Sequence, residues 1–185
     1  RWDRRDNDFY SYRGNLFGFG FNLNEGIRDT KASFSKYNLE LQQFIPLGGV
    51  RRTLALRFNG VITDDRSPAG IDAPVFAFER LGGNRTVRAY RNGRFVDEDM
   101  IVGNVEYRYP MWWVEAESGI AMDVVAFFDF GTVMPDLSKM QRKDIRNGAG
   151  FALYMVTARS LIGHFLVGWT SEGARVDLAI RGPIR

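Results

Sequence analysis

The sequence contains no cysteine and only one histidine, His164, among its 185 residues. The absence of cysteine excludes a disulfide framework, a thiolate zinc site and a cysteine nucleophile. A single histidine excludes multi-histidine metal sites, and we expect His164 to be a packing residue or to face a polar interior. With one histidine on a predicted strand, no Ser-His-Asp triad can be assembled. We therefore predict that the chain is not an enzyme and uses no catalytic residue, cofactor or metal.

Long hydrophobic runs are also missing. No stretch approaches the ~18 consecutive apolar residues of a membrane-spanning helix, and the best candidate, 124–130, is interrupted by Asp129. The sequence also lacks a large excess of charge of either sign, because 25 basic and 22 acidic residues leave a net charge of only +3. So small an excess does not indicate a nucleic acid partner, and we predict none.

Strict alternation of side-chain type is what the sequence does contain. One set of alternate residues near the N-terminus is large and apolar: Phe17, Phe19, Phe21 and Leu23. The residues between them are mostly small or polar: Leu16, Gly18, Gly20 and Asn22. Because successive side chains of a strand point to opposite faces, this pattern predicts a strand with one aromatic face and one small or polar face.

Eight segments show this alternation. We predict strands at residues 15–23, 32–45, 50–63, 100–110, 119–131, 147–157, 161–171 and 174–182. These strands have about 9 to 14 residues, whereas strands of water-soluble sheets average about 5 or 6. A tilted strand that crosses a membrane needs about 9 to 11 residues. The lengths therefore favour a transmembrane sheet.

The chemistry of the two faces agrees with this interpretation. One face carries large aromatic side chains, and the other carries glycine together with charged residues. Aromatic residues also gather near strand ends, as the interfacial girdles of membrane barrels do: Tyr107, Tyr109, Trp112, Trp113 and Trp169. We predict an all-β fold, a transmembrane antiparallel up-and-down β-barrel of eight strands in one domain, 1–185. A soluble eight-stranded lipid-binding barrel is the alternative.

The lengths of the connections predict an orientation. Short turns are expected at 46–49, 111–118 and 158–160, and a long polar loop is expected at 64–99. In outer-membrane barrels the short turns face the periplasm and the long loops face outward. The predicted location is therefore the bacterial outer membrane, with membrane lipid as a partner.

Four segments resemble a known family. Residues 76–90 read Phe-Ala-Phe-Glu-Arg-Leu-Gly-Gly-Asn-Arg-Thr-Val-Arg-Ala-Tyr, 103–110 read Gly-Asn-Val-Glu-Tyr-Arg-Tyr-Pro, and 127–131 read Phe-Phe-Asp-Phe-Gly. Together with an upstream strand-entry pattern at 4–14, their order and spacing resemble the BamA/TamA-type outer-membrane barrel superfamily, also called the bacterial surface antigen family. The resemblance corresponds to the second half of a sixteen-stranded barrel.

The resemblance implies a role for the long loop. In that family the loop folds back into the lumen, and its arginine pairs with acidic residues on neighbouring strands. Carried over, Arg88 is expected to meet Glu106 and Asp129. The motif that joins loop and lumen then comprises Gly82, Gly83, Val87, Arg88, Tyr90, Glu106 and Asp129. The alternative is that Arg88 is simply a solvated loop charge. Arg88 also belongs to a basic run with Arg85, Arg91 and Arg94, for which we expect a role in the lumen or at lipid headgroups in preference to nucleic-acid binding.

Three features depart from the family pattern. Ala89 stands where the family has glycine, and alanine would be strained if the position needs a positive φ. The family usually carries periplasmic domains before its barrel, and none fits in this chain. Members commonly end in an aromatic residue, whereas this chain ends Gly182-Pro183-Ile184-Arg185.

Two hypotheses for function follow. The resemblance implies a barrel that inserts or translocates client outer-membrane proteins. The alternative is a small structural outer-membrane barrel without assembly activity. An eight-stranded barrel has an interior just wide enough for side chains, so the loop at 64–99 does not fit inside it. Because of this conflict we expect a homodimer, in which two chains form one wider barrel.

Overall fold

The computed structural model describes residues 1–8, 10–25, 33–48, 52–65, 74–113, 120–157 and 161–180. The strands are β1 (Trp2–Asp3), β2 (Gly14–Asn24), β3 (Phe34–Pro46), β4 (Thr53–Asp65), β5 (Glu79–Leu81), β6 (Phe95–Asp97), β7 (Asp99–Trp113), β8 (Ala121–Met134), β9 (Arg146–Val156), β10 (Leu161–Thr170) and β11 (Gly173–Ile180). Three short 3-10 helices accompany them: η1 (Val75–Ala77), η2 (Leu137–Lys139) and η3 (Arg142–Asp144). Over these ranges the chain forms no helix long and apolar enough to cross a membrane.

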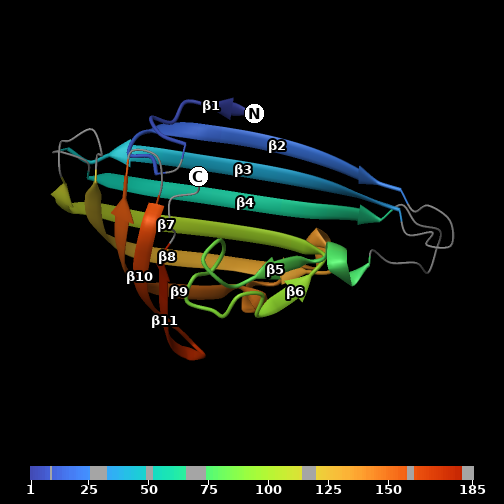
Figure 1. Cartoon of the computed structure of the whole chain (residues 1–185). Helices are drawn as coiled ribbons and strands as arrows, with labels where there is room; N and C mark the ends of the chain where they lie inside the picture. Colours follow the sequence, from blue (N-terminus) through green and yellow to red (C-terminus); the bar gives the residue numbers. More distant parts are fainter. Residues whose placement is uncertain are drawn as a thin grey trace.

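The strands form one large antiparallel sheet (Figure 1). Its order is β1-β2-β3-β4-β7-β8-β9-β10-β11, and β5 pairs with β6 in a separate two-stranded sheet. Each long strand therefore pairs with its neighbours in the chain, which is the up-and-down connectivity that the alternation predicted. The prediction of an all-β antiparallel fold is confirmed.

The large sheet is open. Within the described ranges, no pairing joins β11 to β1 or β2. In Figure 1, β10 and β11 turn steeply away from the direction of β2–β4 and lie on the side of the sheet that carries β5 and β6. The closed barrel therefore stays a prediction, although the sheet already curves about this side.

The outer, convex face is apolar. Directly paired residues on four successive strands, Phe17, Leu41, Phe58 and Gly103, lie on this face in register. Its side chains are exposed, and Phe19 reaches 60%. Gly103 makes room there, because a Cβ at this position would lie 2.2 Å from the ring of Phe130 on β8.

Charged residues are buried on the opposite face, which we call the inner face. Asp129 on β8 is 0% exposed, and Arg88, which reaches it from the loop, is 4% exposed. In a water-soluble protein charged residues are almost never fully buried unless they are paired. The arrangement, with aromatic residues outside and charges inside, is that of a sheet whose outer face meets an apolar medium.

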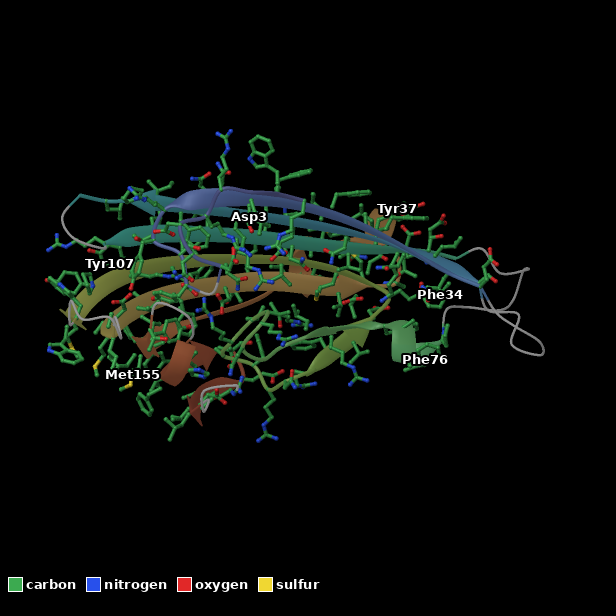
Figure 2. The ribbon with its side chains drawn as sticks, turned by 45° about the horizontal axis from the view of Figure 1, so that its top comes forward. Asp3, Phe34, Tyr37, Phe76, Tyr107 and Met155 are labelled. Carbon is green, nitrogen blue, oxygen red and sulfur yellow. The ribbon has the colours of Figure 1, made fainter. Side chains whose placement is uncertain are left out.

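The ends of some strands differ from prediction. Residues 111–113 were expected in a turn, but β7 continues through Trp113, which pairs with Ala121. The register shifts between Pro110 and Trp112, so a bulge lets the strand pass the proline. Tyr107 and Met155 mark this end of the sheet in Figure 2, and Phe34, Tyr37 and Phe76 mark the other. The remainder of that turn and the expected turn 158–160 lie outside the described residues.

The connection expected at 64–99 has its own structure. β4 ends at Asp65, β7 begins at Asp99, and the described part between them, from residue 74, contains η1 and the β5–β6 pair. This loop packs on the inner face, where Leu81, Val87 and Tyr90 form a buried cluster with Val61, Met100 and Val102 of β4 and β7. We call residues 74–98 the inner loop.

Candidate functional site

Two glycines fold the tip of the inner loop. Gly82 and Gly83 have φ values of +112° and +91°, which L side chains rarely adopt. A Cβ at Gly82 would also lie 2.2 Å from the carbonyl oxygen of Arg91. Hydrogen bonds then close the turn, since Gly83 N donates to Tyr90 O over 3.0 Å and Gly82 N donates to Thr86 Oγ1 over 2.8 Å. The folded tip directs Arg88 toward the sheet.

Arg88 binds Asp129 through three of its N–H groups. The backbone N donates to Asp129 Oδ2 over 2.9 Å, and Nε donates to the same oxygen over 2.8 Å. Nη2 donates to Asp129 Oδ1 over 2.6 Å. The side-chain contacts use both carboxylate oxygens, which is the bidentate geometry that a guanidinium offers and an ammonium does not.

The other end of the Arg88 guanidinium meets Glu106 on β7. Nη1 donates to Glu106 Oε1 and, over 3.1 Å, to the Tyr154 hydroxyl on β9. The guanidinium carbon also lies 4.2 Å from the centre of the Phe127 ring. Burial lowers the pKa of Arg88, but Glu106 and Asp129 outweigh burial and raise this pKa well above its ordinary value. The loop arginine is therefore held as a cation by three strands.

Two residues that the sequence analysis did not single out complete this cluster. Arg108 donates from Nε to Glu106 Oε2 over 2.8 Å, so two guanidiniums share Glu106. Asn104 donates to Asp129 Oδ1 over 2.8 Å and to the backbone oxygen of Thr86 over 2.7 Å. Both residues alternate with apolar ones on β7, and that pattern marks them as facing inward. We call Arg88, Asn104, Glu106, Arg108 and Asp129 the first anchor.

The N-terminal segment also crosses the inner face, which the sequence did not indicate. Arg108 Nη1 donates to Ser11 O over 2.8 Å, and its guanidinium carbon lies 4.0 Å from the ring centre of buried Tyr10. The Tyr12 hydroxyl donates to Asp123 Oδ2 on β8 over 2.9 Å. Residues 10–12 therefore cover the first anchor on one side.

Ala89, which departs from the family pattern, lies over two glycines of the sheet. A Cβ added at Gly148 on β9 would lie 2.9 Å from the Ala89 Cβ, and one at Gly168 on β10 would lie 2.7 Å from it. The space for the extra methyl group is thus provided by the strands beneath it. Val87 and Tyr90, on either side, are buried in the cluster described above.

The remaining candidates lie apart from the first anchor. Arg94 pairs with Glu172 over 3.1 Å at an exposed position. The run Asp97-Glu98-Asp99 is acidic, but across the described ranges no group of three or more His, Asp or Glu residues is placed to hold a metal ion. Asp99 instead accepts a hydrogen bond from Thr63 N over 2.8 Å.

The structure thus brings together Arg88, Glu106 and Asp129, which lie far apart in the sequence. A search of curated proteins finds no match to this chain. A family model, the Omp85 superfamily domain, matches residues 1–163, a range that contains the whole of the first anchor. The chain belongs to the Omp85 superfamily.

Proposed function

We propose that this chain is the barrel, or part of the barrel, of an outer-membrane protein that inserts or translocates client polypeptides. One observation supports this most strongly: the inner loop is fixed by Arg88 to Glu106 and Asp129 on the inner face of an open sheet. Membership of the Omp85 superfamily points to the same class of activity. The proposed insertion or translocation depends on the surfaces and edges of the barrel and uses no catalytic residue or cofactor.

The outer face supports a location in the bacterial outer membrane. Every long strand carries exposed large apolar side chains on this face, and exposed Trp112, Trp113 and Tyr109 gather at the end of β7. Aromatic residues of this kind belong at the boundary between lipid and water. By the short connections between strands, this end of the sheet faces the periplasm.

The two edges of the sheet need partners in lipid, where unpaired backbone groups cost several kcal/mol each, on the order of the cost of burying a bare amide. The inner loop occupies the space into which the sheet would have to close on itself. We propose that a second copy of the chain supplies the missing neighbours. β1 and the residues after it cover the edge of β2 only up to Phe17, so residues 18–24 have no partner strand on that side in the described structure. β2 and β11 run in opposite directions, so this part of β2 in one copy and β11 of the other would pair antiparallel in a closed sheet.

Such a seam also offers a physical route to insertion. A sheet edge that is paired only weakly accepts an added strand from a client, because the main-chain hydrogen bonds are independent of sequence. Client outer-membrane proteins are therefore the proposed partners, in addition to membrane lipid. A small structural barrel would have the same architecture and no effect on clients.

The test is an assisted-folding assay. Liposomes that contain the folded chain receive a urea-unfolded eight-stranded outer-membrane barrel as the probe, and the heat-modifiable folded band of the probe is followed over time. We expect the chain to increase the rate of probe folding several-fold over empty liposomes, and Arg88→Ala to remove most of this gain. Arg85→Ala is the matched control, because Arg85 is exposed on the same loop. Equal rates with and without the chain would show a structural barrel.

A further inference from the structure

A second set of contacts joins the inner loop to the last hairpin, β10–β11, and it lies outside the first anchor. The residues involved on the hairpin, from His164 to Asp177, follow the segment 1–163 that the family model matches. We propose that Asn84, His164, Arg175 and Asp177 form a second anchor, which couples the inner loop to β11 and so positions the free edge of the sheet. This proposal does not depend on the proposed insertion activity.

The hairpin needs such support because β11 has only one strand neighbour in the described structure. It pairs with β10 from Thr170↔Gly173 to Gly163↔Ile180, and its other side has no partner strand there. Its outward residues, Val176 and Leu178, are 62% and 68% exposed. Contacts that fix its position must therefore come from β10 or from the inner face.

Arg175 binds two backbone carbonyl groups of the inner loop. Its Nη1 donates to Arg88 O over 2.7 Å and to Tyr90 O over 2.5 Å. These two carbonyl groups flank Ala89, the residue that lies against Gly148 and Gly168. Arg175 can make both bonds only when the loop tip is seated on the sheet, so the contact depends on the position of the loop.

The Asp177 carboxylate accepts hydrogen bonds from three side chains. Its Oδ1 accepts from Arg175 Nη2 over 2.9 Å, and its Oδ2 accepts from Asn84 Nδ2 over 2.7 Å. His164 Nε2 lies 2.8 Å from the same Oδ2 and 3.3 Å from Asn84 Nδ2. Because an ionised carboxylate can only accept, we assign the proton of His164 to Nε2, which donates to Asp177 Oδ2 beside the Asn84 amide. One carboxylate thereby connects β10, β11 and the loop.

The loop therefore bridges two parts of the sheet. The first anchor fixes it to β7 and β8 through Arg88, and the second anchor fixes β10 and β11 to it. Figure 1 shows the hairpin on the same side of the sheet as the loop. A displacement of the loop is expected to move β11, because Arg175 binds the backbone carbonyl groups of Arg88, which belongs to the first anchor, and of Tyr90, two residues further along the loop.

The cysteine-free sequence allows a direct test by spin-label distances. One pair, Ile62→Cys and Val176→Cys, reports the distance from β4 to the edge strand. A reference pair, Leu41→Cys and Tyr107→Cys, lies on β3 and β7, and all four positions are exposed on the outer face. We expect Arg175→Met to lengthen and broaden the first distance and to leave the reference distance unchanged.

Matched variants separate coupling from a general loss of stability. Arg94→Met removes the exposed pair with Glu172 on the same hairpin and should leave both distances as in the wild type. Arg88→Met should move the edge as Arg175→Met does, and the double variant should move it no further. Asp177→Asn, which keeps the side-chain volume, serves if Arg175→Met does not fold. An unchanged edge distance in Arg175→Met or Asp177→Asn would overturn the proposal, as would a lower melting temperature without movement of the edge.

Discussion

At the scale of single residues, the first anchor depends on buried charges that pair with one another. Asp129 is inaccessible to solvent, yet it accepts hydrogen bonds from Arg88 and Asn104. A buried ion pair adds little net stability compared with an apolar pair, but removal of one partner leaves an uncompensated charge in a confined space. The first anchor should therefore be intolerant of neutral substitutions at either end.

Asp129→Asn tests this directly. The substitution keeps the shape of the side chain but leaves Arg88 with only Glu106 as a counter-charge, so the free energy of unfolding should fall by about 3–5 kcal/mol. Urea unfolding in detergent, followed by tryptophan fluorescence, measures the change. Glu172→Gln is the control, because its exposed pair with Arg94 should contribute no more than about 1 kcal/mol. Equal losses in the two variants would contradict the prediction.

The contact between Ala89 and the sheet gives a second residue-scale prediction. In Gly168→Ala the new methyl group would lie 2.7 Å from the Ala89 Cβ, and such overpacking typically costs about 1–3 kcal/mol. Adding Ala89→Gly should recover part of this loss in the same unfolding measurement. Gly20→Ala on β2 is a suitable control, since its nearest neighbour would be 3.6 Å away. No recovery in the double variant would show that the loop is not seated on Gly168.

At the scale of elements, alternation was enough to predict where the strands lie, because a strand with one outer and one inner face leaves a two-residue period in the sequence. Where strands end was less predictable. Trp112 and Trp113 looked like turn residues after Pro110, but the pairing with β8 and a bulge carry β7 past the proline. Such ends are fixed by hydrogen bonding to a neighbour, which the local sequence does not contain.

The candidate site was likewise predictable only in part. Arg88, Glu106 and Asp129 were expected to meet because of a family resemblance, and the structure places them in contact. For Arg108 and Asn104, the alternation along β7 indicated only that the side chains lie on the inner face and not which residues they contact. The crossing of residues 10–12 over the inner face left no periodic signal, because a segment without regular structure has none.

Tyr10→Ala tests the contribution of that N-terminal segment. Tyr10 is buried against Tyr12, Tyr154 and the Arg108 guanidinium, so loss of the ring should cost about 3–5 kcal/mol. The urea midpoint in detergent provides the measurement. Asp8→Ala, in the same segment but at an exposed position, should leave the midpoint close to that of the wild type. An unchanged midpoint for Tyr10→Ala would mean that the segment does not cover the sheet.

At the scale of the whole molecule, the open sheet predicts association. If a second copy pairs with both edges, light scattering in detergent should give a protein mass of twice 21.1 kDa, about 42 kDa. The folded species should need detergent to stay in solution and should migrate differently on a gel before and after heating. A protein mass of 21.1 kDa alone would exclude the homodimer. The strands that close the sheet would then have to come from something other than a second copy of the chain.

The register of the outer face sets a condition on any such seam. Followed across the sheet, Val176 on β11 is level with Val167, Phe151, Ala126, Tyr107, Leu54 and finally Ile45. Ile45 lies beyond the first paired residue of β2, Gly14, whereas the aromatic run of β2 begins only at Phe17. The apolar belt thus drifts along the strands from one edge to the other. If the belt is level in the bilayer, the strands cross it obliquely, as barrel strands tilted by about 35–45° do. If two copies join, their edges would therefore meet with a stagger that brings the apolar residues of β11, such as Val176, to the depth of the aromatic run of β2.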